Sequence, residues 1–298
     1  MKRCVIALGV ILSLASCSGG GSASGGGGGG NPILPITPTN PPTTFSTTGT
    51  IADAGTNGGN AAGISGATVA LYAQNVALTT PIATATTAAN GSFTISSVPN
   101  GSYVIQVTPP ANSNAPTGFS YPFYHAAAAV SGTTTLATIK LDLLTSDDQT
   151  WIVKTNSDRT SYGAAALKAD ETAMLAARAW ANQLAIDPTV GHGTTTTPQQ
   201  RYANVGGIGA DSENIGVNLA DQTWPNTEAA WMAESQNCPQ PTAYSTSPNP
   251  SNGQSTGHFL AIVNPAQLWI GVGENLNGAS SPPGSKWSDF DAEYISYP

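Results

Sequence analysis

The sequence predicts two folded domains of different classes, an N-terminal all-β sandwich and a C-terminal α-β-α sandwich. The chain has 298 residues, enough for two ordinary domains. Between Ser18 and Ile139 it carries one acidic residue, Asp53, and no Lys or Arg, whereas charged residues are frequent from Lys140 onward. Apolar residues alternate with polar ones before this change and recur at helical spacing after it. We therefore expect a domain boundary near residue 145.

The charge balance excludes nucleic acid as a partner. The chain has nine Lys and Arg and seventeen Asp and Glu, which gives a net charge of −8. It contains no cluster of basic residues that could neutralise a phosphate backbone. The abundance of short polar residues, together with 22 Pro, is typical of an exported protein whose side chains hydrogen-bond turns and solvent.

Residues 1–16 are predicted to be a signal peptide. Lys2 and Arg3 form a basic start, and Val5 to Leu14 is an apolar stretch too short to span a bilayer as a permanent helix. The stretch ends in Leu14-Ala15-Ser16-Cys17, which resembles a bacterial lipobox. The resemblance implies lipidation of Cys17, and hence an exported lipoprotein held at a bacterial membrane or surface. The alternative is an ordinary signal peptide that is cut at another small residue.

Residues 17–44 are predicted to be the lipidated cysteine and a tether. The first part is rich in Gly and the second in Pro, so the first is expected to be flexible and the second extended.

The cysteines predict no disulfide. Cys4 leaves with the signal peptide and Cys17 is acylated, so Cys238 has no intramolecular partner. We expect an inert thiol at Cys238, and hydrophobic cores that hold the domains together.

Residues 45–144 are predicted to form the β-sandwich. The alternating apolar positions are Val69 and Leu71; Phe93 and Ile95; Tyr103, Ile105 and Val107; and Ile139, Leu141 and Leu143. Asn90-Gly91 and Asn100-Gly101 predict tight hairpin turns, and turn signals at this spacing favour a sandwich.

The run from Ala89 to Ile105, ANGSFTISSVPNGSYVI, resembles the prealbumin-like modules known as carboxypeptidase regulatory-like or Cna-B-type domains. Some Cna-B modules form an isopeptide bond from a first-strand Lys, but no Lys precedes Lys140 in this domain. The resemblance implies a spacer or an adhesive stalk. The aromatic group Tyr121, Phe123 and Tyr124 with His125 is interpreted as strand packing, with a sugar-stacking surface as the alternative.

Residues 145–298 are predicted to form the α-β-α sandwich. Ala173, Ala177, Trp180 and Leu184 share one face of a helix that Asp170 caps and Asp187-Pro188 ends. A second helix is predicted from Thr227, with Trp231 and Glu234 on one side. Strands are predicted at 258–263, 268–272 and 287–295. A sheet that is apolar on both faces needs helices on both faces.

Several motifs in this domain occur in the order seen in the CAP (SCP-like) superfamily, to which residues 148–298 are similar. The motifs include Asn156 and Arg159, the helix from Met174 to Ala181, Gly191-His192, Ser212-Glu213-Asn214-Ile215, Ala230-Trp231-Met232-Ala233-Glu234 and Gly257-His258-Phe259. The resemblance implies a cleft that contains His192, Glu213, Glu234 and His258. Ser212, Leu260 and Asn264 depart from the pattern of the family, and Gly273-Glu274-Asn275 repeats one motif out of order.

Two imidazoles and two carboxylates in one cleft would suit zinc or another divalent cation. Taken singly, His192 and Glu234 are interpreted as a loop histidine and a solvated carboxylate. The sequence contains no H-E-x-x-H motif, and no catalytic residue is assigned.

Three functions remain open at this point. The first is a binding module for a small apolar ligand, an envelope component or a partner. The second is a metal-assisted hydrolase in which Glu213 or Glu234 is the base. The third is a structural or adhesive stalk. We favour binding, because a fold alone specifies no reaction.

Overall fold

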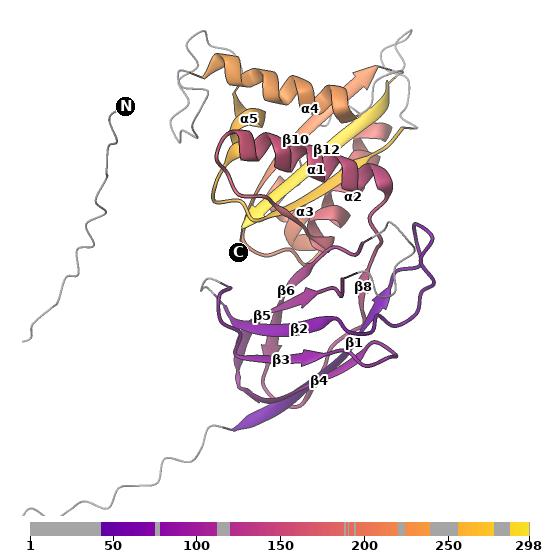
Figure 1. Ribbon diagram of the computed structural model, residues 1–298, viewed down its shortest axis with the longest axis vertical. Helices are drawn as coiled ribbons and strands as arrows, with labels where there is room; N and C mark the ends of the chain where they lie inside the picture. The colour runs from indigo at the N-terminus through magenta and orange to yellow at the C-terminus, as the bar shows by residue number, and fades with distance from the viewer. Residues whose placement is uncertain are drawn as a thin grey trace, which may run out of the picture. The chain divides into compact units, whose positions relative to one another are not determined.

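The computed structural model describes residues 43–74, 78–111, 120–187, 189, 191–193, 195–219, 224–238, 256–276 and 287–297 (Figure 1). The predicted signal peptide, Cys17 and nearly all of the predicted tether lie outside these residues. Within the described ranges, no helix combines the length and the apolar character needed to cross a membrane.

The first domain is a sandwich of two four-stranded sheets, as predicted. One sheet consists of β1 (Thr44–Asp53), β4 (Ser92–Pro99), β7 (Thr134–Thr135) and β8 (Ile139–Leu141), in which β1 pairs with the other three. The other has the order β3-β2-β5-β6, built from β3 (Ala83–Thr86), β2 (Thr68–Ala73), β5 (Gly101–Thr108) and β6 (Tyr124–Val130).

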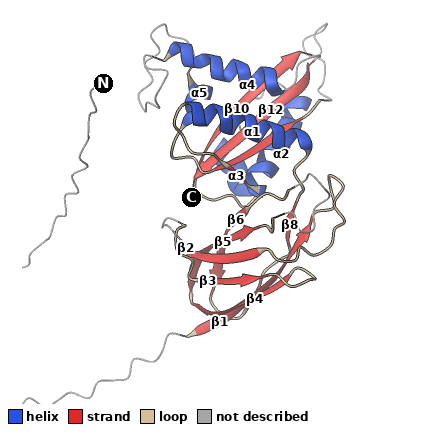
Figure 2. Ribbon diagram, in the orientation of Figure 1, coloured by secondary structure: helices blue, strands red, loops and turns tan. Residues whose placement is uncertain are grey.

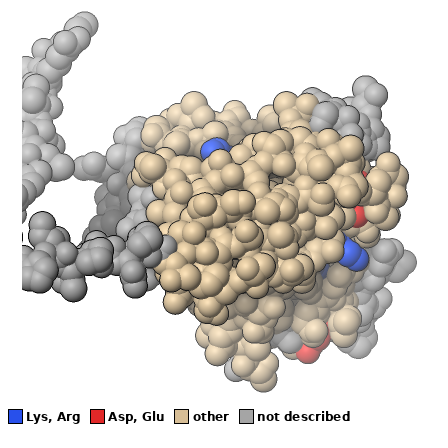
Figure 3. All heavy atoms as spheres, turned by 90° about the horizontal axis from the view of Figure 1, so that it is seen from below, with Lys and Arg blue, Asp and Glu red and all other residues tan. Residues whose placement is uncertain are grey.

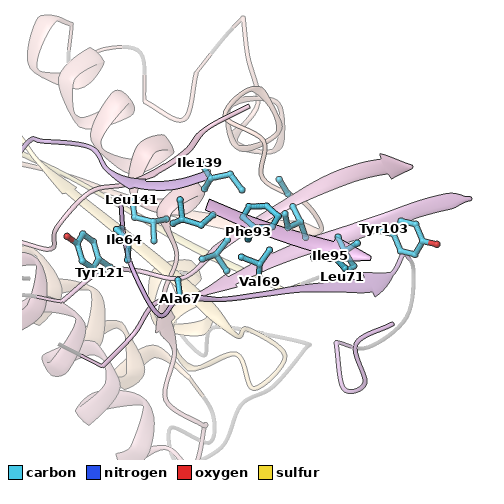
Figure 4. Packing of buried hydrophobic residues seen from close by; sticks show 14 of the residues in the cluster. Ile64, Ala67, Val69, Leu71, Phe93, Ile95, Tyr103, Tyr121, Ile139 and Leu141 are labelled. Atoms are coloured by element: carbon cyan, nitrogen blue, oxygen red, sulfur yellow. The ribbon is translucent and has the colours of Figure 1, made fainter. Parts of the chain in front are cut away.

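The core of the sandwich lies between the two sheets (Figure 4). Phe93 and Ile95 of β4 are buried, and their polar neighbours Thr94 and Ser96 are exposed. Because successive side chains of a strand point to opposite faces, this alternation directs every second residue into the core. The predicted apolar positions are confirmed, and Leu143 is the last residue of this core.

The two Asn-Gly pairs do not form hairpins, so this prediction was wrong. Asn90-Gly91 leads from β3 to β4 and Asn100-Gly101 from β4 to β5, and in each case the two strands belong to different sheets. Gly91 has φ +77°, and a Cβ there would lie 2.1 Å from the carbonyl oxygen of Ile51. Glycine is needed at this crossing for both reasons.

The second domain is built on a four-stranded sheet of order β10-β12-β11-β9. Its strands are β9 (Lys168–Ala169), β10 (Ala210–Leu219), β11 (Trp269–Glu274) and β12 (Trp287–Tyr297), and its helices are α1 (Ser146–Ser161), α2 (Glu171–Ile186), α3 (Pro198–Asn204), α4 (Trp224–Ala233), the 3-10 helix η2 (Glu234–Asn237) and α5 (Gly257–Val263). Asp170 caps α2 as predicted, since its side chain accepts from the N–H of Ala173.

Helices cover both faces of this sheet, as predicted (Figure 2). On one face, a Cβ at Gly271 of β11 would lie 2.0 Å from the backbone of Ala173, so the absent side chain lets α2 pack directly on the strand. On the other face, Ile270 and Val272 join the core formed with α1, α4 and α5. The small residues of α2 and the glycines of β11 therefore act together to let the helix and the strand pack closely.

Two secondary-structure predictions in this domain were wrong. Residues 258–263 are not a strand but the helix α5, in which Phe259, Ile262 and Val263 are buried at spacings of three and four residues. The second predicted helix begins at Trp224 rather than at Thr227.

The two domains are joined by hydrogen bonds as well as by the chain. The N–H of Phe123 donates to the carbonyl of Ala169 at 2.8 Å, and the N–H of Glu171 donates to the carbonyl of Phe123 at 2.7 Å. Nδ1 of His125 lies 2.7 Å from Oδ1 of Asp170, and both side chains are buried. The aromatic group that includes His125 is therefore divided between the sandwich and this junction.

Charged side chains are sparse on the face shown in Figure 3. Some of the charges in the described part of the second domain are paired. Arg178 bridges Asp142 and Asp148, each at 2.8 Å, and Lys154 contacts Asp158.

Candidate functional site

The four residues predicted for the cleft lie on four different elements. His192 lies in the loop between α2 and α3, Glu213 in β10, Glu234 at the start of η2, and His258 in the first turn of α5. The structure arranges them as two His–Glu pairs. Nδ1 of His192 lies 2.9 Å from Oε1 of Glu213, and Nδ1 of His258 lies 2.7 Å from Oε1 of Glu234.

Arg201, which the sequence did not lead us to expect at the site, holds the Glu213 side chain in place. The Glu213 side chain is 0% exposed, and Nη2 of Arg201 donates to its Oε1 at 2.6 Å and to its Oε2 at 2.5 Å. The guanidinium also donates to the carbonyls of His192 and Thr196, and it lies 3.6 Å from the ring centroid of Trp180. Arg201 thus links two elements of the site: the loop that contains His192 and the strand β10, which contains Glu213.

The local sequence contained a signal for this contact. Thr197 and Gln200 form a reciprocal capping box at the start of α3, and Pro198 occupies its first turn. Arg201 therefore begins the second turn of a helix whose position is set. Its partner lies twelve residues further along the chain, which only the tertiary fold reveals.

Glu234 serves α5 as well as His258. Its Oε2 accepts from the backbone N–H of His258 at 3.0 Å and from that of Phe259 at 3.3 Å. A carboxylate at this place satisfies N–H groups that a helix start leaves without partners. The Trp231 ring stacks on the His258 ring at 5.6 Å with an interplanar angle of 17°. Both Trp231 and Glu234 thus contact His258, in agreement with their predicted placement on one side.

Asn214 connects the two pairs. Its side-chain Nδ2 donates to the carbonyl of His258 at 3.3 Å, so β10 and α5 are held together next to Glu213. Ser212, on the other side of Glu213, accepts from Nε2 of Gln267 at 3.1 Å. Glu274 of the out-of-order motif does not join the pairs, and its Oε1 accepts from the N–H of Trp224.

Asn156 and Arg159, two other motif residues, are structural. The amide of Asn156 donates to the carbonyl of Leu167 at 3.0 Å and accepts from the Leu167 N–H at 2.7 Å. The buried guanidinium of Arg159 donates to the carbonyls of Ala165, Ile262 and Asn264. They fasten α1 to the segment that follows it and to the end of α5.

In both imidazoles of the site, Nδ1 faces a carboxylate. A carboxylate at Nδ1 orients the ring and favours the tautomer with a proton there, which leaves Nε2 as an acceptor. The His192 side chain is 52% exposed and that of His258 is 29% exposed. Within the ranges that the structure describes, no three His, Cys, Asp or Glu side chains are grouped to hold a metal ion. The geometry fits two separate imidazole donors with carboxylates behind them better than a set of four ligands.

A further carboxylate, Glu228 of α4, is fully buried and was not predicted. Its Oε2 accepts from Nε1 of Trp151 at 2.7 Å and from the hydroxyl of Thr155 at 3.0 Å, and its Oε1 has no hydrogen-bond partner among the described residues. Burial raises the pKa of Glu228 to about 7, against the opposing effect of these two hydrogen bonds.

Cys238 is a free cysteine next to the site. Burial, and then the charge of Glu234, raise the pKa of its thiol. A protonated thiol is a poor nucleophile; the inert role of Cys238 stays a prediction.

Comparison with known proteins assigns both domains. Residues 153–281 match the family model of CAP, the cysteine-rich secretory protein family, and residues 43–113 match the second β-sandwich domain of BOS complex subunit NOMO1-like proteins. No curated protein matches the chain significantly.

Three solved structures are similar to parts of the chain. GBS52, the minor pilin of Streptococcus agalactiae, is 18% identical over 35% of this chain with a TM-score of 0.28, and this chain spans about half of that pilin, 47%. An outer surface protein from Borrelia burgdorferi is 16% identical over 52% of this chain and 95% of its own, with a TM-score of 0.37. BmVAL-1 is 19% identical over 51% of this chain and 78% of its own, with a TM-score of 0.34.

The domain assignment rests on the family models, because all three TM-scores lie below 0.5. A domain from a family named for secretory proteins indicates an extracellular or surface protein. Residues 153–281 are therefore a CAP domain of the cysteine-rich secretory protein family, and a β-sandwich domain precedes it.

Proposed function

We propose that this chain is a lipid-anchored protein of a bacterial cell envelope, and that its CAP domain binds a small apolar ligand, an envelope component or a partner at the His192/His258 site. The observation that carries the proposal is the engagement of both carboxylates. Glu213 is occupied by Arg201, and Glu234 by the backbone of α5. The edges of the two imidazoles are what the site offers to a ligand.

The same observation weighs against the metal-assisted hydrolase. A general base must reach the water that it activates and take its proton. In this site each oxygen of Glu213 already accepts from a guanidinium, and the oxygens of Glu234 accept from the ring and the backbone at the start of α5. Recognition needs no such base.

Co-sedimentation tests the binding function. The soluble Cys17→Ala chain, which carries no acyl group, is incubated separately with purified peptidoglycan sacculi and with outer-membrane vesicles, and the bound fraction is measured. We expect sedimentation with one of the two, and a loss of at least about fivefold in affinity in the His192→Ala/His258→Ala double variant. Lys154→Met, on the exposed side of α1, is the control. If the double variant sediments like the unaltered protein, or if neither material binds, the proposed site is wrong.

The same incubations test the hydrolase. We expect no release of soluble fragments that depends on Glu213 or Glu234. If fragments are released and the release disappears in Glu213→Gln or Glu234→Gln, the protein is a hydrolase and the proposed binding function is wrong.

The anchor is tested separately by mass spectrometry of the mature N-terminus. We expect an acylated Cys17 and a soluble product from Cys17→Ala. An unmodified N-terminus at another residue would remove the anchor but leave the binding site unaffected.

A further inference from the structure

A second cavity, unrelated to the His–Glu pairs, lies where the sandwich meets the CAP domain. It has a volume of about 630 Å³, and its lining includes Tyr72, Gln106 and Phe123 from the sandwich and Lys168, Leu268 and Trp269 from the CAP domain. Its volume is in the range of pockets that hold small organic ligands. None of these residues belongs to the candidate site described above.

The cavity has walls that the fold holds in place. Phe123 and Trp269 contact each other with ring centroids 5.5 Å apart, and Trp269 lies 3.9 Å from the His125 ring, which is itself bound to Asp170. Nε2 of Gln106 lies 3.0 Å from Nε2 of His125. The side chains of Gln106, His125 and Asp170 contact one another across the domain junction. The His125 ring also lies against Trp269 of the cavity wall, so the cavity is formed before any ligand binds.

Lys168 gives the cavity its charge. Its Nζ lies 5.1 Å from the ring centroid of Phe123 and 5.5 Å from that of Trp269. Arg178, Arg201 and Lys154 each pair with a carboxylate, whereas no carboxylate of the described chain pairs with Lys168 and none lines this cavity. An ammonium group held over aromatic rings, with no counter-ion, leaves room for an anion.

Apolar surface supplies the rest of the lining. Leu268 is 45% exposed, although it follows the buried loop residue Gln267. An exposed leucine beside three aromatic side chains offers a contact area that a ligand would remove from water. A neutral apolar ligand would leave the Lys168 charge without a partner, and a small polar anion would leave the rings uncovered.

We propose that this junction cavity binds an organic anion, a carboxylate on an apolar ring body, with the carboxylate at Lys168 and the ring against Trp269 and Leu268. Binding there would touch both domains at once. The ligand would therefore favour their paired arrangement, because it has surface on each side.

Isothermal titration calorimetry with 2-naphthoate tests the proposal, with 2-naphthalenemethanol as a neutral probe of nearly the same shape. On the soluble Cys17→Ala chain at pH 7, we expect naphthoate to bind about fivefold more tightly than the alcohol, the size of an exposed charge pair. Lys168→Met, which keeps the apolar stem, should abolish the difference, and Lys168→Arg should keep it. Lys154→Met is the matched control and should change nothing.

The position of the ring is tested by Leu268→Ala, which should weaken both probes roughly threefold through the loss of apolar contact. Leu276→Ala, a similarly exposed leucine outside the cavity lining, is its control. The His192→Ala/His258→Ala variant should bind naphthoate normally, so this inference and the proposed function fail separately. Equal affinity for the two probes, no binding of either at millimolar concentration, or indifference to Lys168→Met or Leu268→Ala would each overturn the proposal.

Discussion

Replacing Arg201 with methionine tests how the candidate site is held together. Arg201 is 10% exposed and its partner Glu213 is 0% exposed, so the ion pair is buried. Removal of the guanidinium would leave Glu213 with His192 as its remaining partner among the contacts described. The loss of one member of a buried pair costs about 3–5 kcal/mol, because the other charge stays without compensation.

This free energy predicts a large change in melting temperature. For a chain of this size, 1 kcal/mol shifts Tm by about 2–4 °C, so Arg201→Met should lower Tm by about 6–20 °C in scanning calorimetry. The double variant Arg201→Met/Glu213→Gln should recover a large part of the loss, because the uncompensated carboxylate is then gone. Glu213→Gln alone should cost less than Arg201→Met, since Arg201 keeps its two carbonyl acceptors.

Two outcomes would refute this reasoning. A loss below about 1 kcal/mol would mean that the pair behaves as an exposed one. A double variant that is no more stable than Arg201→Met would mean that the arginine acts through its contact with Trp180 and not through Glu213.

Three further predictions concern packing, ionisation and metal. Gly271→Ala should destabilise the protein by more than about 3 kcal/mol in urea unfolding, because its Cβ would overlap the α2 backbone; Gly132→Ala, with open space around it, should change stability by less than about 0.5 kcal/mol. Burial raises the pKa of Glu228 to about 7 from 4.5, so the stability it contributes is full below pH 4.5 and is lost as the pH rises through 7. In thermal melts at pH 5 and pH 8, the stability of Glu228→Gln relative to the unaltered protein should therefore be higher at pH 8. A difference in stability that is the same at both pH values would contradict the raised pKa of Glu228. Zinc, measured by calorimetry, should bind weakly through the imidazoles, less at pH 5.5 than at pH 7.5, and not at all after His192→Gln/His258→Gln; unchanged affinity in that variant would return both residues to a structural role.

The elements with a sustained pattern were predictable from the sequence. The four residues predicted for one face of α2 are buried and an aspartate caps the helix, and β4 and β5 alternate over several residues. Residues 258–263 were not predictable in this way, because a run of six mostly apolar residues satisfies both periods. The contact of Glu234 with the N–H groups of His258 and Phe259 favours the helix, and it joins segments that are far apart in the sequence.

The arrangement of the candidate site was not predictable from the motifs. The motifs identified His192, Glu213, Glu234 and His258, whereas the division into two pairs depends on Arg201 and on the start of α5. Sequence order carries no information on which carboxylate a guanidinium reaches. These two sets of contacts engage both carboxylates and leave the two imidazoles.

The parallel pairing of the first and last strands of the sandwich determines how the domain bears a mechanical load. Ile51, Ala52 and Asp53 of β1 lie opposite Ile139, Lys140 and Leu141 of β8 in parallel register. A pull on the N-terminal end of β1 and a pull from the CAP domain on the C-terminal end of β8 act at opposite ends of this ladder. The strands are then sheared, so their hydrogen bonds stretch together instead of opening one after another. A pull between the two ends of the sandwich would thus load these hydrogen bonds in shear.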